Sequence, residues 1–246
     1  MSRLEVLALD PLPEVRSGDD LAALIEDAAG GELHAGDIVV VAQKVVSKAE
    51  GAVVDLAGVE PSERARELAE PFDKDPRHVQ VVLDQSAELV RVERGILICR
   101  THHGFVCANA GVDASNAGAP GRVITLPVDS DASARALRAA LPGRPAVVIT
   151  DSFGRAWRHG QADVAIGIAG LAPLEDWRGR TDAHGRELHA TLIAIADEVA
   201  AAADLVRGKD SQVPVVLVRG LERHVTEADG PGVAALLRAA TEDLFL

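Results

Sequence analysis

Short apolar runs recur along the chain and predict the strands of a protein that mixes strands with helices. The uninterrupted run at residues 38–42 is typical of a strand buried on both faces. Residues 160–171 mix Gly, Ala and Ile almost without charge, which fits either a packed strand or a close crossing of two backbones. The predicted strands are residues 4–9, 38–42, 123–126, 146–150 and 214–219, with a hairpin over residues 95–109.

Polar capping residues and prolines mark where the predicted helices begin. The segment 17–20 precedes Leu21, Leu24 and Ile25, which share one helical face. Pro61, followed by an acidic turn, and Asp75-Pro76 are typical helix starts. Further helices are predicted over residues 130–141, 190–206 and 233–246.

Strands and helices alternate without a fixed period or a long linker, so we predict one continuous unit over residues 1–246. The fold class is α+β (mixed α/β), with two interleaved lobes as the expected arrangement. The net charge of -13 argues against nucleic acid and anionic membranes as partners. No apolar run approaches the roughly 20 residues that span a bilayer, and Met1 leads directly into a strand without a signal peptide. We expect a cytoplasmic protein.

The two cysteines and two of the histidines lie in the predicted hairpin. Cys99 and Cys107 flank its turn, so a disulfide is sterically feasible, but the expected compartment favours reduced, buried thiols. His102 and His103 are adjacent and lack helical ligand spacing, which favours turn residues over a zinc site. Phosphate-binding loops, dinucleotide-binding glycine motifs and nucleophile elbows are absent from the sequence.

Two polar stretches at predicted strand ends carry the strongest candidate chemistry. They are residues 109–116, which contain Asp113, and residues 149–155, which contain Asp151 and Ser152. If the two strand ends meet, these oxygen ligands could hold Mg²⁺ or Mn²⁺. The plainer alternatives are that Asp113 and Asn116 form turns and that Asp151-Ser152 caps a helix.

Basic side chains near these stretches extend the hypothesis to phosphate chemistry. Lys48 could place a point charge on a phosphate, and Arg155 or Arg158 a bidentate fork. The alternatives are a solvated charge at Lys48 and a surface stripe around Trp157.

Several motifs together resemble the coenzyme F-420:L-glutamate ligases, the CofE family. The similarity runs in order from Leu4 to about Leu246, which makes it specific where each motif alone is weak. The motifs are VVSKAEG at 45–51, NAGVDASN at 109–116, TDSFGRAWR at 150–158, ADEVAAAADL at 196–205 and PVVLVRG at 214–220.

The resemblance implies an enzyme that adds L-glutamate to the side chain of a deazaflavin coenzyme precursor. GTP would phosphorylate the acceptor carboxylate, and the glutamate amine would displace phosphate to give an amide and GDP. Asp113 and Asp151 would hold one divalent metal and Ser152 the second, with K⁺ as a further candidate. Arg155 or Arg158 would stabilise the transferring phosphoryl. The implied GTP contacts are Leu12, Pro13, Glu14, Val15, Gln43, Lys48, Asn116, Lys209, Asp210, Ser211 and Gln212.

The resemblance also implies a homodimer with intertwined subunits. Two departures from the pattern matter: Ser152 stands where many members have Thr, and the 206–213 loop varies within the family. No fused flavin domain and no FMN site are predicted. Two other functions stay open: a GTP-dependent amide ligase for another small carboxylate, and a dimeric nucleotide-binding protein with an inactive site. The joint presence of Asp113, Asp151 and Lys48 disfavours the second.

Overall fold

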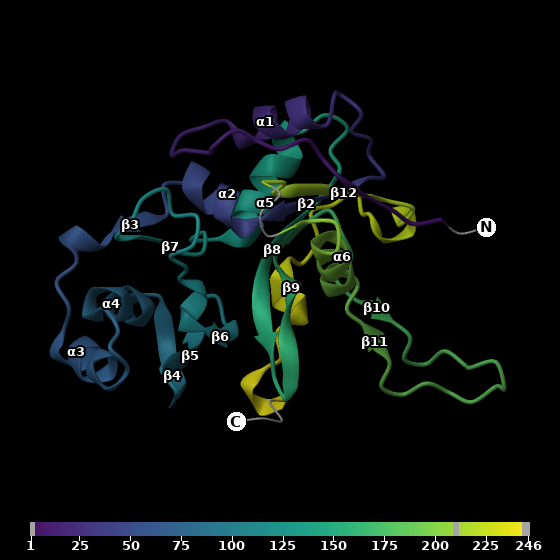
Figure 1. Cartoon of the computed structure of the whole chain (residues 1–246). Coiled ribbons are helices and arrows are strands. Elements are labelled where there is room, and N and C mark those ends of the chain that lie inside the picture. The colour runs from purple at the N-terminus through teal and green to yellow at the C-terminus, as the bar shows by residue number, and fades with distance from the viewer. Residues whose placement is uncertain (1–2, 209–211, 243–246) are drawn as a thin grey trace.

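The computed structural model describes residues 3–208 and 212–242, and its centre is a five-stranded mixed sheet (Figure 1). The strand order is β1-β12-β2-β8-β9. Only the β2–β8 pair is parallel, and the other three pairs are antiparallel. The bounds are β1 Glu5–Ala8, β2 Ile38–Ala42, β8 Ala146–Arg155, β9 Arg158–Ala169 and β12 Val215–Arg219.

The interior strands of this sheet are buried on both faces, as their apolar sequences predict. Four consecutive residues of β2, Ile38 to Val41, are fully buried, and β12 has the same pattern. Helices α5 and α6 pack against β8 and β9, and α1 packs against α5. The α-helices of the described residues are α1 Leu21–Ala28, α2 Gln43–Ala49, α3 Glu63–Ala69, α4 Pro76–Asp84, α5 Ser130–Ala140 and α6 Ile195–Asp204.

A second, smaller hydrophobic core is formed by the stretch from Val54 to Val123, of which only Phe105 packs in the larger core. In it, α4 packs against β4 of a three-stranded antiparallel sheet, and α3 packs against α4. The chain leaves the larger core after α2 and returns to it before α5, so the smaller core is an insertion (Figure 1). Its strands are β4 Ser86–Glu93, β5 Ile96–Thr101 and β6 Val106–Ala108, and β3 Val53–Asp55 pairs with β7 Arg122–Ile124 beside them.

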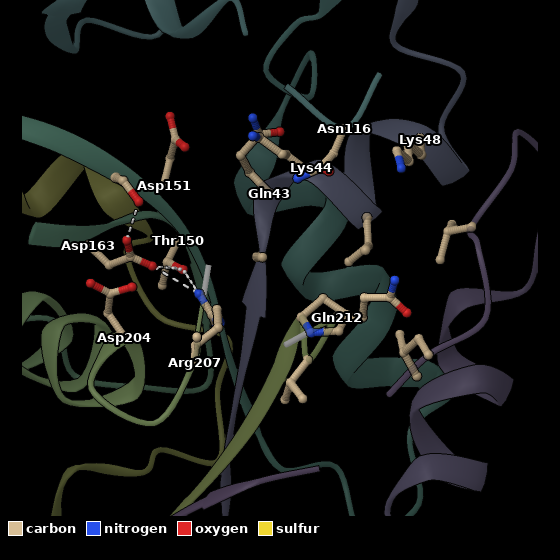
Figure 2. A pocket seen from close by; sticks show the side chains of 18 of the residues that line it. Gln43, Lys44, Lys48, Asn116, Thr150, Asp151, Asp163, Asp204, Arg207 and Gln212 are labelled. Atoms are coloured by element: carbon tan, nitrogen blue, oxygen red, sulfur yellow. Dashed lines mark hydrogen bonds and ion pairs between the residues drawn. The ribbon is translucent and has the colours of Figure 1, made fainter. Parts of the chain in front are cut away.

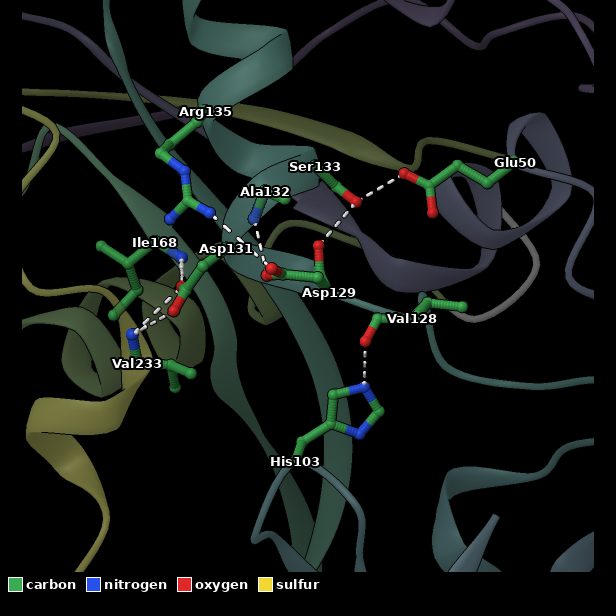
Figure 3. A network of polar contacts seen from close by, with 10 residues as sticks. All are labelled: Glu50, His103, Val128, Asp129, Asp131, Ala132, Ser133, Arg135, Ile168 and Val233. Carbon is green, nitrogen blue, oxygen red and sulfur yellow. Dashed lines mark hydrogen bonds and ion pairs between the residues drawn. The ribbon is translucent and has the colours of Figure 1, made fainter. Parts of the chain in front are cut away.

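The start of α5 ties the larger core together through one carboxylate (Figure 3). Asp131 accepts hydrogen bonds from the backbone N–H groups of Ile168 and Val233, at 2.8 and 3.1 Å. Gly167 allows the close approach of β9 to this helix, because a Cβ atom there would lie 2.4 Å from the Ser130 carbonyl oxygen. Residues 160–171 are therefore both a packed strand and a close backbone crossing.

Several sequence predictions need correction. The closing helix predicted from Val233 is wrong over the described residues, which form only two 3₁₀ turns, Val233–Leu236 and Ala240–Glu242. Its apolar residues pack against the larger core, and the N–H of Val233 bonds to Asp131. The helix predicted from residue 190 begins at Ile195, because β11, Leu192–Ile193, pairs with β10, Glu175–Asp176. Strand β4 was not predicted, since its charged, largely exposed sequence lacks an apolar run.

None of the helices in the described part of the chain has the length and apolar character needed to cross a membrane.

The two hairpin histidines each place Nε2 against a main-chain carbonyl, His102 against Asp84 and His103 against Pro127. This agrees with their prediction as turn residues.

The two cysteines face each other across β5 and β6 as free, buried thiols. Burial raises the pKa of Cys107 to about 12 and also raises the pKa of Cys99. A thiol reacts as its thiolate, and the thiolate is lost when the pH is below the pKa.

We predict that a disulfide reagent at about pH 8 labels neither cysteine of the native protein, since both pKa values are above the ordinary value of about 8.5. Both thiols should react in concentrated guanidinium chloride, where burial is removed. Absorbance of the released thiol measures this, and rapid labelling of the native protein would contradict it.

Candidate active site

Helix α2 begins directly where β2 ends and carries three polar side chains to one cavity (Figure 2). Gln43, Lys44 and Lys48 line this cavity, which has a volume of about 530 Å³. Lys44 and Lys48 are four residues apart, so they project from the same side of the helix. The end of the buried strand thus fixes where two ammonium groups and an amide lie.

The neighbouring strand β8 supplies the opposite wall of the cavity with Thr150, Asp151 and Ser152. These residues lie within the strand, which continues to Arg155, so neither the predicted polar turn nor the helix cap exists here. Burial raises the pKa of the Asp151 carboxyl to about 7, and the nearby charge of Asp163 adds to the rise. A buried carboxyl of this kind favours a cation as its partner when it ionises.

Asp113 comes from the inserted segment, where one carboxylate oxygen forms the predicted turn and the other faces a lysine. Its Oδ1 accepts the Ser115 backbone N–H at 2.7 Å, which is a turn-forming bond, and its Oδ2 lies 2.6 Å from Lys44 Nζ. Burial acts to raise the pKa of Asp113, but the bonds from Lys44 and Ser115 outweigh it, and the pKa stays below its ordinary value. Asp113 does not itself line the cavity. It reaches the cavity through Lys44, whose charge also acts on Asp151.

A buried carboxylate that the sequence did not single out, Asp163 of β9, organises the floor of the site. Its Oδ1 accepts the Ser152 hydroxyl at 2.6 Å, and its Oδ2 accepts the Thr150 hydroxyl at 3.0 Å. Arg207 Nη1 also lies 2.9 Å from Oδ2. Burial lowers the pKa of Arg207, while the Asp163 charge opposes that shift.

The segment before α1 closes the cavity from a third side. Glu14 Oε1 lies 2.7 Å from Lys48 Nζ, which joins this segment to α2. Asn116 has a left-handed backbone, with φ at 58°, in accordance with the turn predicted there. The sequence-predicted residues that line the cavity are Leu12, Pro13, Glu14, Val15, Gln43, Lys48, Asn116, Asp151, Ser152 and Gln212.

One polar group that lines the cavity, on Gln43 of α2, lacks a hydrogen-bond partner among the described residues. Gln43 is buried, and its Oε1 accepts the Ser47 hydroxyl at 2.7 Å, but its Nε2 has no hydrogen-bond partner there. A buried donor without a partner costs about 1–3 kcal/mol, so it marks a place where a ligand acceptor would bind favourably.

A second cavity, of about 1000 Å³, adjoins the first and shares Glu14, Val15, Lys48 and Asn116 with it. Its remaining wall includes Arg16, Arg122 and residues 117–120. The Glu14–Lys48 pair therefore lies in the wall that two adjoining cavities share.

Some predicted site residues lie elsewhere. Arg155 and Arg158 sit at the exposed tip of the β8–β9 hairpin, where the Arg155 guanidinium bonds to the carbonyls of His159 and Gly160. They do not line the cavity of this chain. The predicted contacts Lys209, Asp210 and Ser211 lie outside the described residues.

The oxygen atoms of Asp151 and Ser152 in the cavity wall, with Asp113 beside the cavity against Lys44, are suited to a divalent cation shared with a phosphate ligand. In residues 3–208 and 212–242, no three His, Cys, Asp or Glu side chains form a group that could hold a metal ion. Mg²⁺, however, is commonly bound by one or two carboxylates together with substrate phosphate oxygens. Asp113, Asp151 and the Ser152 hydroxyl supply hard oxygen ligands of this type.

Sequence reasoning missed Lys44, Asp163 and Arg207. Lys44 had a usable signal, because its spacing from Lys48 places both on one helical face. The Asp163–Arg207 pair had none, since its members are 44 positions apart and meet only when β9 and the end of α6 pack together.

Comparison with known proteins assigns the family. Residues 11–220 match the family model described as F420-0:Gamma-glutamyl ligase. A protein of Methanopyrus kandleri named Coenzyme F420:L-glutamate ligase is 46% identical, with 100% of both chains covered. Proteins of the same name from Methanothermobacter thermautotrophicus and Natronomonas pharaonis are 43% and 47% identical, with at least 94% of each chain covered.

We predict that Arg207→Met lowers the free energy of unfolding by about 3–5 kcal/mol, because it leaves the buried Asp163 carboxylate without its cation. Urea unfolding followed by circular dichroism measures the change. Arg155→Met is the matched control, and its exposed side chain should change stability by about 0.5 kcal/mol or less. Equal stability of the two variants would contradict the prediction.

Proposed function

The chain belongs to the F420-0:gamma-glutamyl ligase family, and on that premise we propose that it joins L-glutamate to a deazaflavin coenzyme F420 precursor, using GTP. The observation that carries this proposal is the gathering of Lys44, Lys48, Asp151 and Ser152 at one cavity, with Asp113 held against Lys44. Carboxylates, a hydroxyl and ammonium groups together are suited to a nucleotide triphosphate with its divalent cations.

The proposed reaction has two steps. An oxygen of the acceptor carboxylate attacks the γ-phosphorus of GTP, which breaks the bond to the β-phosphate oxygen and gives an acyl phosphate and GDP. The glutamate amine then attacks the acyl carbon, phosphate leaves, and the amine loses a proton. Both reactants of the first step are anions, so their repulsion must be neutralised before they meet.

Side chains of this chain support each requirement. Asp113, Asp151 and Ser152 would hold two divalent cations, Mg²⁺ or Mn²⁺, whose charge would neutralise the phosphates. Lys48 and Gln43 Nε2, which has no hydrogen-bond partner among the described residues, would bind GTP, together with Asn116 and the segment 12–15. Gln212 would contribute from the other side of the cavity, and K⁺ stays a further candidate cofactor. The second cavity offers space for the non-reacting part of a long ligand.

The exposed hairpin tip supports a homodimer. Trp157 is 80% exposed there, and the hairpin projects away from the rest of the molecule (Figure 1). Exposed aromatic residues are enriched at interfaces. A dimer in which this tip reaches the second copy's cavity would bring Arg155 or Arg158 to the transferring phosphoryl.

We predict GDP release from GTP only when the glutamate-free coenzyme precursor, L-glutamate and Mg²⁺ or Mn²⁺ are all present. Asp113→Ala and Asp151→Ala should each lower kcat by about 100-fold or more, because charge neutralisation at the phosphates is lost. Asp27→Ala, on the exposed side of α1, is the control and should keep full activity. Absence of turnover by the unaltered protein would refute the proposed function, and turnover with another small carboxylate alone would reassign the acceptor.

Light scattering at micromolar concentration should give twice the chain mass of 25.7 kDa. Trp157→Ala should shift this equilibrium toward the single chain, because it removes the largest exposed apolar group of the tip. A mass of one chain for the unaltered protein would exclude the dimer.

A further inference from the structure

Asp163 is placed to determine whether the Ser152 hydroxyl turns its hydrogen or its lone pairs toward the cavity. The two residues are directly opposite each other in the β8–β9 register. Asp163 is only 3% exposed, and it accepts the Ser152 hydroxyl proton at 2.6 Å. Figure 2 shows the Asp151 carboxylate turned away from Asp163, so the two carboxylates lie on different faces of the β8–β9 pair.

A hydroxyl has one hydrogen and two lone pairs, and it can bind a cation only through a lone pair. Serine lacks the β-branch that restricts the side-chain rotation of threonine, so its hydroxyl needs an external restraint. The bond to Asp163 supplies that restraint. Because the hydroxyl hydrogen points to Asp163 on β9, the lone pairs of the Ser152 oxygen point away from Asp163.

Arg207 fixes the carboxylate that receives this hydrogen. Its Nη1 lies 2.9 Å from Asp163 Oδ2 and 3.0 Å from the Thr150 hydroxyl oxygen, and its side chain is 11% exposed. Oδ2 thus receives Arg207 and Thr150, which leaves Oδ1 for Ser152. The orientation of the carboxylate is set by three donors from β8 and the end of α6.

We propose that Asp163, held by Arg207, is a positioning residue that makes Ser152 an acceptor for a divalent cation at the cavity. The inference rests on the proposed function, in which Ser152 binds such a cation. It adds a residue on β9 whose carboxylate acts through the Ser152 hydroxyl and not as a cation ligand.

Asp163→Asn tests the inference because the amide keeps the shape but changes the donors. The amide oxygen is attracted to Arg207, so the NH₂ group faces Ser152. An NH₂ group only donates, so Ser152 must accept its hydrogen bond and loses a lone pair. Ser152→Ala removes the hydroxyl altogether.

Binding of Mn²⁺ in the presence of GDP, followed by the electron paramagnetic resonance signal of free Mn²⁺, gives the readout. Asp163→Asn and Ser152→Ala should each weaken Mn²⁺ binding by about tenfold or more, the size typical of changes around metal ligands. The double variant should bind no more weakly than Ser152→Ala alone, because Asp163 acts only through the hydroxyl. Asp197→Asn is the control, since Asp197 accepts the Ala165 N–H of the same strand at 2.9 Å and its amide can do the same.

The outcomes separate the two proposals. If Ser152→Ala leaves Mn²⁺ binding unchanged, Ser152 is not a ligand, and both this inference and that part of the proposed metal site fail. If Ser152→Ala weakens binding but Asp163→Asn does not, only the positioning role fails. If Asp163→Asn weakens binding further in the Ser152→Ala background, Asp163 acts by its own charge or through the fold, which also overturns the inference. Circular dichroism melting checks that each variant is folded.

Discussion

The parallel pairing of β2 with β8 is the constraint on which the site depends. Parallel strands end at the same edge of a sheet, and the register here sets Ala42 opposite Thr150. The residues that follow this pair, Gln43 and Lys44 after β2 and Asp151 and Ser152 on β8, must therefore lie side by side. Both strands are buried on both faces, so a slip by one residue would exchange their side chains between two packed faces and bring a polar residue from the strand end toward the core, which is disfavoured. The hydrophobic core thus fixes the positions of the charged groups.

Charge around the cavity is balanced by pairs that link distant parts of the chain. Lys44 contacts Asp113, Lys48 contacts Glu14, and Arg207 contacts Asp163. In a chain with a net charge of -13, such pairing limits repulsion among carboxylates that are crowded together. The three pairs differ in exposure, and only Asp163–Arg207 is buried on both sides. Removing one partner should therefore matter most for this pair.

The sequence predicted the elements whose pattern is local and missed what depends on tertiary contact. The run at 38–42 and the capped helix at Leu21 were found because an apolar period and an Asp cap suffice to define them. The length of β8 was underestimated, since its polar half is a strand only because β9 pairs with it. For the same reason Asp151 and Ser152 were predicted near a turn. Gln43 and Lys48 were placed at the site by family resemblance, whereas Asp163 has no local signal and needed the folded β9.

The insertion of the smaller core has a consequence for how the protein responds to ligands. Asp113 belongs to the inserted stretch, whereas Asp151 belongs to the central sheet, so the distance between their carboxylates depends on how the two cores are spaced. A ligand that contacts both residues would bind most tightly at one spacing and would favour it over others. By the same linkage, a change in the contact between the cores would alter the affinity for such a ligand without touching the cavity. Because of the insertion, a ligand that contacts both residues would favour one arrangement of the two cores, and that arrangement would set the affinity for the ligand.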